Sequence, residues 1–210
     1  MSLSKSQNEQ VENILRSSLR RKFANYKPES KYMPFHTRLL GKDRMALFSF
    51  IHSLNTNFGT AIFEPVAIGL ASTRFKHYER QVSVGDKISE KAHEEIQQII
   101  DSLTTAESEP KKPDEIERIR RVCQSGKMAH VKLTKVDLLL ETYDGDIILF
   151  DLKTVKPNVG NFKEFKRTLL EWVAAILAQN PQANVASAIA IPYNPYHPNP
   201  YNRPVFRTLT

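Results

Sequence analysis

Several classes of protein are excluded by what this sequence has little of. Cys123 is the only cysteine in 210 residues, so the chain cannot form an internal disulfide or a zinc site built from several thiolates. The longest apolar run is WVAAILA, Trp172 to Ala178, whereas a membrane-spanning helix needs about 20 such residues. The first ten residues, MSLSKSQNEQ, lack the apolar stretch of a signal peptide. We therefore expect a reduced, cytoplasmic protein with no membrane segment.

Phosphate-cradling glycine loops and histidine metal centres are also missing. The seven glycines are dispersed and form no Gly-x-Gly-x-x-Gly or Walker-type run, so we expect no nucleotide cofactor. The six histidines show no ligand spacing among themselves.

The composition is that of an ordinary globular protein with a basic bias. Apolar residues make up 40% of the chain and charged residues 25%, and a length of 210 residues suits one domain. Thirty Lys and Arg residues against 23 Asp and Glu residues give a net charge of +7. This charge favours a polyanion as the partner.

The first part of the chain has helical periodicity. Apolar residues recur every three or four positions over residues 11–26, and a second apolar helical segment, which we expect to be buried, follows Gly41; it includes Met45, Leu47, Phe48, Ile51 and Leu54. A third helix should start at Ser89, whose hydroxyl can cap free amides. We expect residues 1–75 to form a mainly helical N-terminal part of a single domain spanning residues 1–210.

The remaining residues, 76–210, contain a strand hairpin. VDLLLE (136–141) and DIILFDLK (146–153) flank the turn Tyr143-Asp144-Gly145, and both strands are apolar on both faces. A sheet buried on both faces needs helices as cover. With a helix expected over residues 161–179 and a strand at ASAIAI, the sequence predicts an α/β fold with a central mixed sheet flanked by helices.

Two acids and a lysine lie on this hairpin. Asp151 and Lys153 share one strand face because side chains alternate. A two-residue loop would turn Asp137 away from Asp151. A three-residue loop with Gly145 left-handed would place Asp137 directly opposite Asp151, and we expect this register because glycine suits the third loop position.

Converging carboxylates suit a hard cation such as Mg²⁺. We therefore expect Asp137 and Asp151 to be metal ligands in phosphodiester hydrolysis, with Lys153 orienting the attacking water or stabilising the oxyanion. In-line attack would leave a 5′-phosphate and a 3′-hydroxyl. Alternatively, the two acids form a structural ion-pair cluster with Lys153 and Lys135.

Other candidate site residues have less specific sequence patterns. Glu94, on the predicted helix after Ser89, is a further candidate metal ligand, although a solvated helix face explains it too. Cations, amides and aromatic residues after the hairpin could contact DNA; the candidate DNA-binding residues are Lys156, Asn158, Asn161, Lys163, Lys166, Tyr193, Asn194 and Arg203. An ordinary loop, a helix start and a proline-stiffened connector would look much the same.

The segment VDLLLETYDGDIILFDLKTVKPN resembles the PD-(D/E)xK nuclease superfamily, with Val136 where that motif often has proline. Together with residues 33–67, FKRTLLEWVA and IAIPYNPYHP, it resembles type II restriction endonucleases of the TdeIII type. This resemblance implies a restriction-endonuclease-like core, with residues 76–210 as the catalytic part. It also implies a Mg²⁺-dependent enzyme that cuts double-stranded DNA at a short palindrome, such as one of the GGNCC kind, as half of a restriction-modification pair.

The leading hypothesis is therefore a site-specific endonuclease, acting as a homodimer because a two-fold protein most simply reads a two-fold site. A non-sequence-specific or repair nuclease of the same fold would share the metal chemistry. A basic, non-catalytic DNA-binding module, in which the acids are structural, is the alternative from another class.

Overall fold

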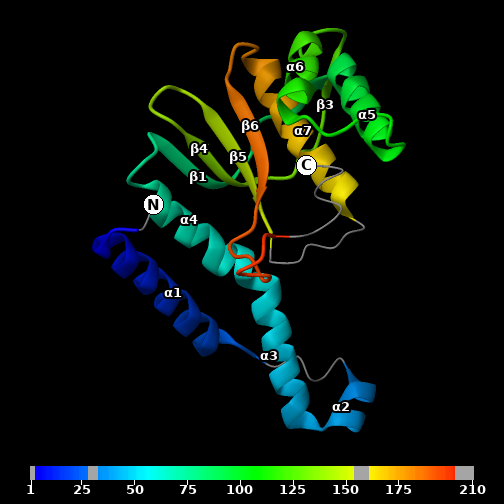
Figure 1. The fold of residues 1–210 in the computed structure, drawn as a ribbon. Helices are drawn as coiled ribbons and strands as arrows, with labels where there is room; N and C mark the ends of the chain where they lie inside the picture. Colours follow the sequence, from blue (N-terminus) through cyan, green and yellow to red (C-terminus); the bar gives the residue numbers. More distant parts are fainter. Residues whose placement is uncertain (1–2, 28–32, 154–160, 202–210) are drawn as a thin grey trace. The chain divides into compact units, whose positions relative to one another are not determined.

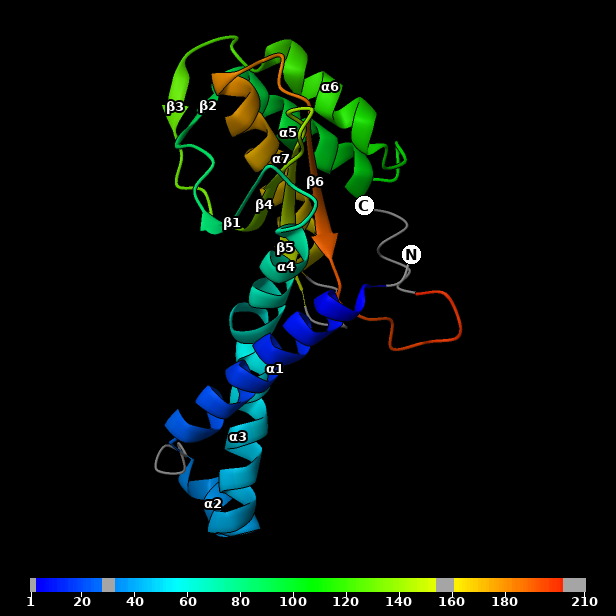
Figure 2. The same cartoon turned by 90° about the vertical axis from the view of Figure 1, so that its left-hand side faces the viewer.

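The computed structural model describes residues 3–27, 33–153 and 161–201, with Thr56 and Asn57 described by their backbone alone. The chain divides into two compact units, residues 1–70 and residues 71–210 (Figures 1 and 2). The first unit is helical and the second contains the sheets. The expectation that both act as one domain stays a prediction. None of the helices in the described ranges is long and apolar enough to span a membrane.

The first unit contains the helices α1 (Lys5–Asn25), α2 (Pro34–Leu40), α3 (Lys42–Phe58) and α4 (Glu64–Ala71), with the π-helical turn η2 (Gly59–Phe63) between the last two. A capping box starts α1: the Ser4 hydroxyl accepts a 3.2 Å hydrogen bond from the Gln7 N–H, and the Gln7 side chain accepts one from the Ser4 N–H. Pro34 starts α2, where its missing N–H has no helical partner to lose.

The expected burial of the helix after Gly41 is largely wrong. Met45 is buried, but the residues Leu47, Phe48 and Ile51 are 60, 51 and 48% exposed. Apolar residues surround much of α3, whereas α1 contacts it along one side, through the ring pair Phe23–Phe50. Helix α2 also packs on α3, and these contacts leave Leu47, Phe48 and Ile51 exposed among the described residues. Periodicity located the helix, but the packing partners decided which face is buried.

The second unit is built on a four-stranded mixed sheet in the order β1-β4-β5-β6 (Figure 1). Strands β1 (His77–Val82), β4 (Val136–Glu141) and β5 (Ile147–Leu152) are antiparallel neighbours, and β6 (Val185–Ala190) runs parallel to β5. A separate antiparallel pair joins β2 (Lys87–Ser89) to β3 (Met128–His130). The hairpin of β4 and β5 is buried on both faces of the sheet, with Leu138 and Leu140 on one face and Leu149 on the other. This burial fits its central position. The predicted α/β class is confirmed.

Three helices gather on one side of this sheet: α5 (Glu90–Thr104), α6 (Lys112–Val122) and α7 (Phe162–Gln179) (Figure 1). Helix α7 packs on β5 and β6, and both other helices pack on α7. The buried Trp172 donates a 2.9 Å hydrogen bond from Nε1 to the Thr134 carbonyl. Ser89 caps α5 as expected, because its hydroxyl accepts from the Ala92 N–H at 3.1 Å.

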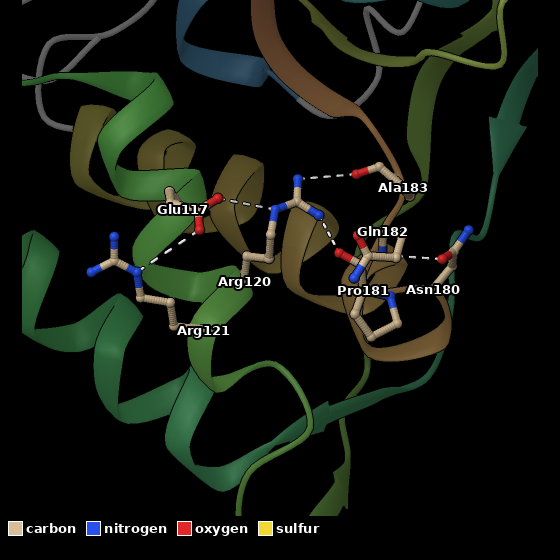
Figure 3. A network of polar contacts seen from close by, with 7 residues as sticks. All are labelled: Glu117, Arg120, Arg121, Asn180, Pro181, Gln182 and Ala183. Carbon is tan, nitrogen blue, oxygen red and sulfur yellow. Dashed lines mark hydrogen bonds and ion pairs between the residues drawn. The ribbon is translucent and has the colours of Figure 1, made fainter.

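One arginine links this helical layer to the turn between α7 and β6 (Figure 3). The guanidinium of Arg120 donates to the carbonyls of Pro181 and Ala183 and pairs with Glu117 at 3.1 Å. Arginine suits this position because its fork of donors can satisfy two backbone oxygens and a carboxylate together. The contact fixes the start of β6, which pairs with β5 and so supports the strand that carries Asp151 and Lys153.

Candidate active site

The hairpin has the register that the three-residue loop predicts. Pairs run from Glu141 opposite Ile147 to Leu138 opposite Phe150. The N–H of Thr142 donates a 2.9 Å hydrogen bond to the Asp146 carbonyl, which closes the loop. Gly145 has φ +89°, the left-handed conformation expected at the third loop position. Continued by one pair, this register places Asp137 directly opposite Asp151, so both side chains lie on one face of the sheet.

Asp137 is held by hydrogen bonds on both carboxylate oxygens. Oδ2 accepts from the backbone N–H of Leu152 at 2.8 Å, and Oδ1 accepts from Nε2 of Gln81 at 3.0 Å. The two donors come from the strands on either side of β4. A carboxylate oxygen can accept more than one bond, so these contacts orient Asp137 without using all its lone pairs.

Asp151 is buried and pairs with a cation. Its side chain is 8% exposed, and its Oδ1 lies 2.6 Å from Nζ of Lys153. Burial raises the pKa of Asp151 above its ordinary value; Lys153 opposes the rise in pKa and Asp137 adds to it. The Lys153 ammonium also lies 4.8 Å from the centroid of the Phe165 ring on α7, within cation–π range. The three predicted catalytic side chains are therefore brought together.

This donor set fits a hard divalent cation. It presents carboxylate oxygens from two neighbouring strands. A cation between them would favour the ionised form of Asp151, whose pKa is raised by burial and further by repulsion from Asp137. No group of three or more His, Cys, Asp or Glu side chains is arranged to hold a metal in the described part of the chain. Magnesium tolerates so sparse a protein ligand set because it keeps several waters and binds substrate phosphate oxygens.

Glu94 is not brought to this pair of aspartates. It lies on the exposed surface of α5, where its Oε2 is 2.7 Å from Nζ of Lys91. This placement is that of a solvated helix face.

The three candidate DNA-binding residues at the start of α7 differ in how deeply they are buried. Asn161 and Lys163 are exposed, as a contact with DNA requires. Lys166 is not: its side chain is 1% exposed and its Nζ lies 2.5 Å from Oε2 of Glu115 on α6. The structure thus corrects the expectation of a surface lysine at position 166. The sequence held a signal for this, because Lys166 follows the buried Phe162 by four residues on the same helical stripe.

The other candidate contacts lie further along the chain. Lys156, Asn158 and Arg203 lie outside the described residues. Tyr193 is exposed. The side chain of Asn194 is engaged within its own loop, where it donates to the Asn199 carbonyl at 2.6 Å and accepts from the Tyr196 N–H at 2.9 Å.

Gln81 was missed by the sequence reasoning. It lies on β1, a strand with few apolar residues and therefore a weak strand pattern. Only the pairing of β1 with β4 brings Gln81 beside Asp137, 56 residues further along the chain.

Comparison of the chain with known protein families gives a match over nearly its whole length. The family described as "Type II restriction endonuclease, HinfI" matches residues 3–209, which include both units. The chain belongs to the HinfI family of type II restriction endonucleases.

Three relatives show how far the likeness to curated restriction enzymes extends. The type II restriction enzyme MjaII of Methanocaldococcus jannaschii is 30% identical over 162 residues, which are 75% of this chain and 41% of that protein. Two enzymes of Herpetosiphon aurantiacus follow. HgiEI is 26% identical over 166 residues (78% of this chain, 59% of that protein), and HgiCII is 25% identical over 168 residues (79% and 60%).

The matched region therefore spans 41–60% of these relatives' length. Among solved structures, none matches the chain significantly.

Proposed function

We propose that this protein is a type II restriction endonuclease that hydrolyses phosphodiester bonds in double-stranded DNA at a short palindromic site. Membership of the HinfI family and the net charge of +7 support DNA as the substrate. The observation that carries the proposal is the convergence of Asp137, Asp151 and Lys153. Asp137 lies opposite Asp151, and Nζ of Lys153 lies 2.6 Å from Oδ1 of Asp151.

Each of these side chains has a distinct task in the proposed reaction. Asp137 and Asp151 would hold Mg²⁺, which when bound supplies a Lewis acid for the phosphate and a more acidic water. Lys153 would hold a water or a phosphate oxygen beside Asp151, because its ammonium has donors beyond the one it directs at Oδ1. In the proposed step the water would lose a proton to solvent as its oxygen bonds to phosphorus, and the O3′ atom would take up a proton from solvent as the P–O3′ bond breaks. The products would be a 5′-phosphate and a 3′-hydroxyl.

Finer features of the proposal rest on the resemblance in sequence. The motif around Asp137, Asp151 and Lys153 resembles that of the PD-(D/E)xK superfamily, with Val136 in place of its proline. The TdeIII-type blocks suggest a site of the GGNCC kind. We also propose a homodimer, in which each active site cuts one strand of a two-fold symmetric site.

Cleavage of a plasmid of known sequence with Mg²⁺, followed by mapping of the ends, tests the proposal. We expect discrete bands with ends at one short palindrome, and 5′-phosphates that ligase can join. A smear or preferential cutting of branched DNA would favour a non-specific or repair nuclease instead.

Two variants test whether the hairpin site does this chemistry. Asp151→Ala should abolish cleavage while DNA binding, measured by a mobility shift without Mg²⁺, is largely retained. Asp144→Asn changes an exposed aspartate at the loop end of the same hairpin and should cleave like the wild type. If the wild type binds DNA but shows no Mg²⁺-dependent cleavage, the protein is a non-catalytic DNA-binding module.

A further inference from the structure

Gln81 has an unusual backbone conformation at a position that faces the proposed metal site. Its φ of +55° lies in the left-handed region, which non-glycine residues occupy only at an energetic cost. The pairs on either side, Arg80 with Leu138 and Val82 with Val136, remain in register. The distortion is therefore confined to the one residue of β1 that lies across from Asp137.

The side chain of this residue makes a specific contact. Nε2 of Gln81 donates to Oδ1 of Asp137 at 3.0 Å, while the Leu152 N–H donates to Oδ2. Rotation of the Asp137 carboxylate about its Cβ–Cγ bond would break both hydrogen bonds. The plane of the carboxylate is thus set by one donor from β1 and one from β5.

We propose that Gln81 is a positioning residue: its amide orients the Asp137 carboxylate so that the remaining lone pairs are directed at a divalent cation shared with Asp151. This inference rests on the proposed function. It adds a residue from a third strand to the site, one that binds neither the cation nor the DNA.

The chemistry of the amide fits this task. Glutamine donates a hydrogen bond without adding charge, whereas a glutamate in its place would set a third carboxylate against Asp137 and Asp151. A lysine would compete with the cation for Asp137. Groups that orient metal ligands in this way commonly contribute 10–100-fold to metal affinity.

A purely structural role makes a different prediction. β1 is an edge strand of the four-stranded sheet, so a cross-strand hydrogen bond at Gln81 could serve only to hold that edge. Its loss would then lower the melting temperature without changing the affinity for a cation.

The test is Mn²⁺ binding by the full chain, measured from the electron paramagnetic resonance signal of free Mn²⁺, with the melting temperature recorded in parallel. Gln81→Gly removes the amide, and glycine adopts φ +55° without strain. We expect about a 10-fold or greater weakening of Mn²⁺ binding. Gln98→Ala, a change at an exposed glutamine of α5, should bind Mn²⁺ like the wild type.

A second variant covers the case in which Gln81→Gly does not fold. Gln81→Asn keeps an amide and tolerates the left-handed conformation, but its side chain is one methylene shorter and should not reach Oδ1. It should show the same loss of Mn²⁺ affinity.

The outcomes separate this inference from the proposed function. The positioning role is overturned if a folded Gln81 variant binds Mn²⁺ with an affinity within twofold of that of the wild type while Asp137→Asn abolishes binding. That result would leave the proposed metal site intact. A wild type that neither binds Mn²⁺ through Asp137 nor cleaves DNA would overturn both.

Discussion

The backbone N–H of Leu152 donates a 2.8 Å hydrogen bond to Oδ2 of Asp137, so the strand that carries Asp151 and Lys153 also holds the carboxylate of the neighbouring strand. This contact depends on the hairpin register, because a shift of one residue would turn Asp137 to the other face of the sheet. The geometry of the candidate site therefore depends on a loop that begins six residues after Asp137.

Asp151→Asn should inactivate the protein and stabilise it. Burial raises the pKa of Asp151, so the folded state binds its proton more tightly than the unfolded chain does. The wild type thus gains stability from this group at low pH and loses it as the pH rises through the raised pKa. Asparagine does not ionise, so the variant should unfold at a higher urea concentration than the wild type at pH 7.

This unfolding can be followed by the fluorescence of Trp172, the only tryptophan, which is buried in α7. A variant that is less stable than the wild type at pH 7 would show that the pairing with Lys153 outweighs the burial of Asp151.

Lys153→Met should remove catalysis and leave DNA binding. The ammonium lies 2.6 Å from Asp151, where the attacking water or the phosphate is expected, and electrostatic groups of this kind contribute about 100-fold or more to the rate. We expect the single-turnover cleavage rate to fall by at least that factor. The affinity for DNA without Mg²⁺ should change little. Lys87→Met, which alters an exposed lysine of β2, is the matched control. If both variants lose the same fraction of the cleavage rate, the loss comes from the lower positive charge of the protein and not from a catalytic role of Lys153.

Lys112 should make stability depend on pH. Its Nζ lies 3.5 Å from the Ser187 hydroxyl, and burial, with the nearby charge of Lys166, lowers the pKa of Lys112 to about 7. Between pH 7 and the ordinary value of 10.5, the unfolded chain holds this proton and the folded protein does not. Its contribution to the free energy of unfolding should therefore rise with pH by about 1.4 kcal/mol per unit over that window.

Lys112→Met should abolish that contribution and be more stable than the wild type at pH 7 and below. The measurement is urea unfolding at pH 6, 7, 8 and 9, with Lys111→Met, a change at the exposed neighbouring residue, as control. A difference between wild type and Lys112→Met that does not vary with pH would contradict the lowered pKa.

Gly145→Ala should destabilise the hairpin through backbone strain alone. The residue has φ +89°, and an added Cβ would meet no atom within 4 Å. Holding alanine in the left-handed region costs about 1–2 kcal/mol. Urea unfolding of Gly145→Ala should show a loss of this size, while Asp144→Ala in the same loop, a residue without positive φ, should not. Equal stability of the two variants would mean that the loop can adopt another turn.

Local patterns in the sequence were enough for much of this fold. The three-residue loop and the two-residue alternation of β4 and β5 predicted that Asp137 faces Asp151, and the register confirms it. The start of α5 and its cap at Ser89 were equally predictable. These features depend on residues a few positions apart, whose geometry is set by backbone conformation and side-chain periodicity.

Tertiary structure decided which distant residues meet. Gln81 reaches Asp137 only because β1 pairs with β4. Lys166 is buried because α6 brings Glu115 to it, and several apolar residues of α3 stay exposed because its contacts with α1 and α2 do not cover them. A sequence pattern shows that a side chain will lie on a given face of its helix or strand. It does not show what will cover that face, since the partner comes from a segment tens of residues away and is selected by the packing of the whole chain.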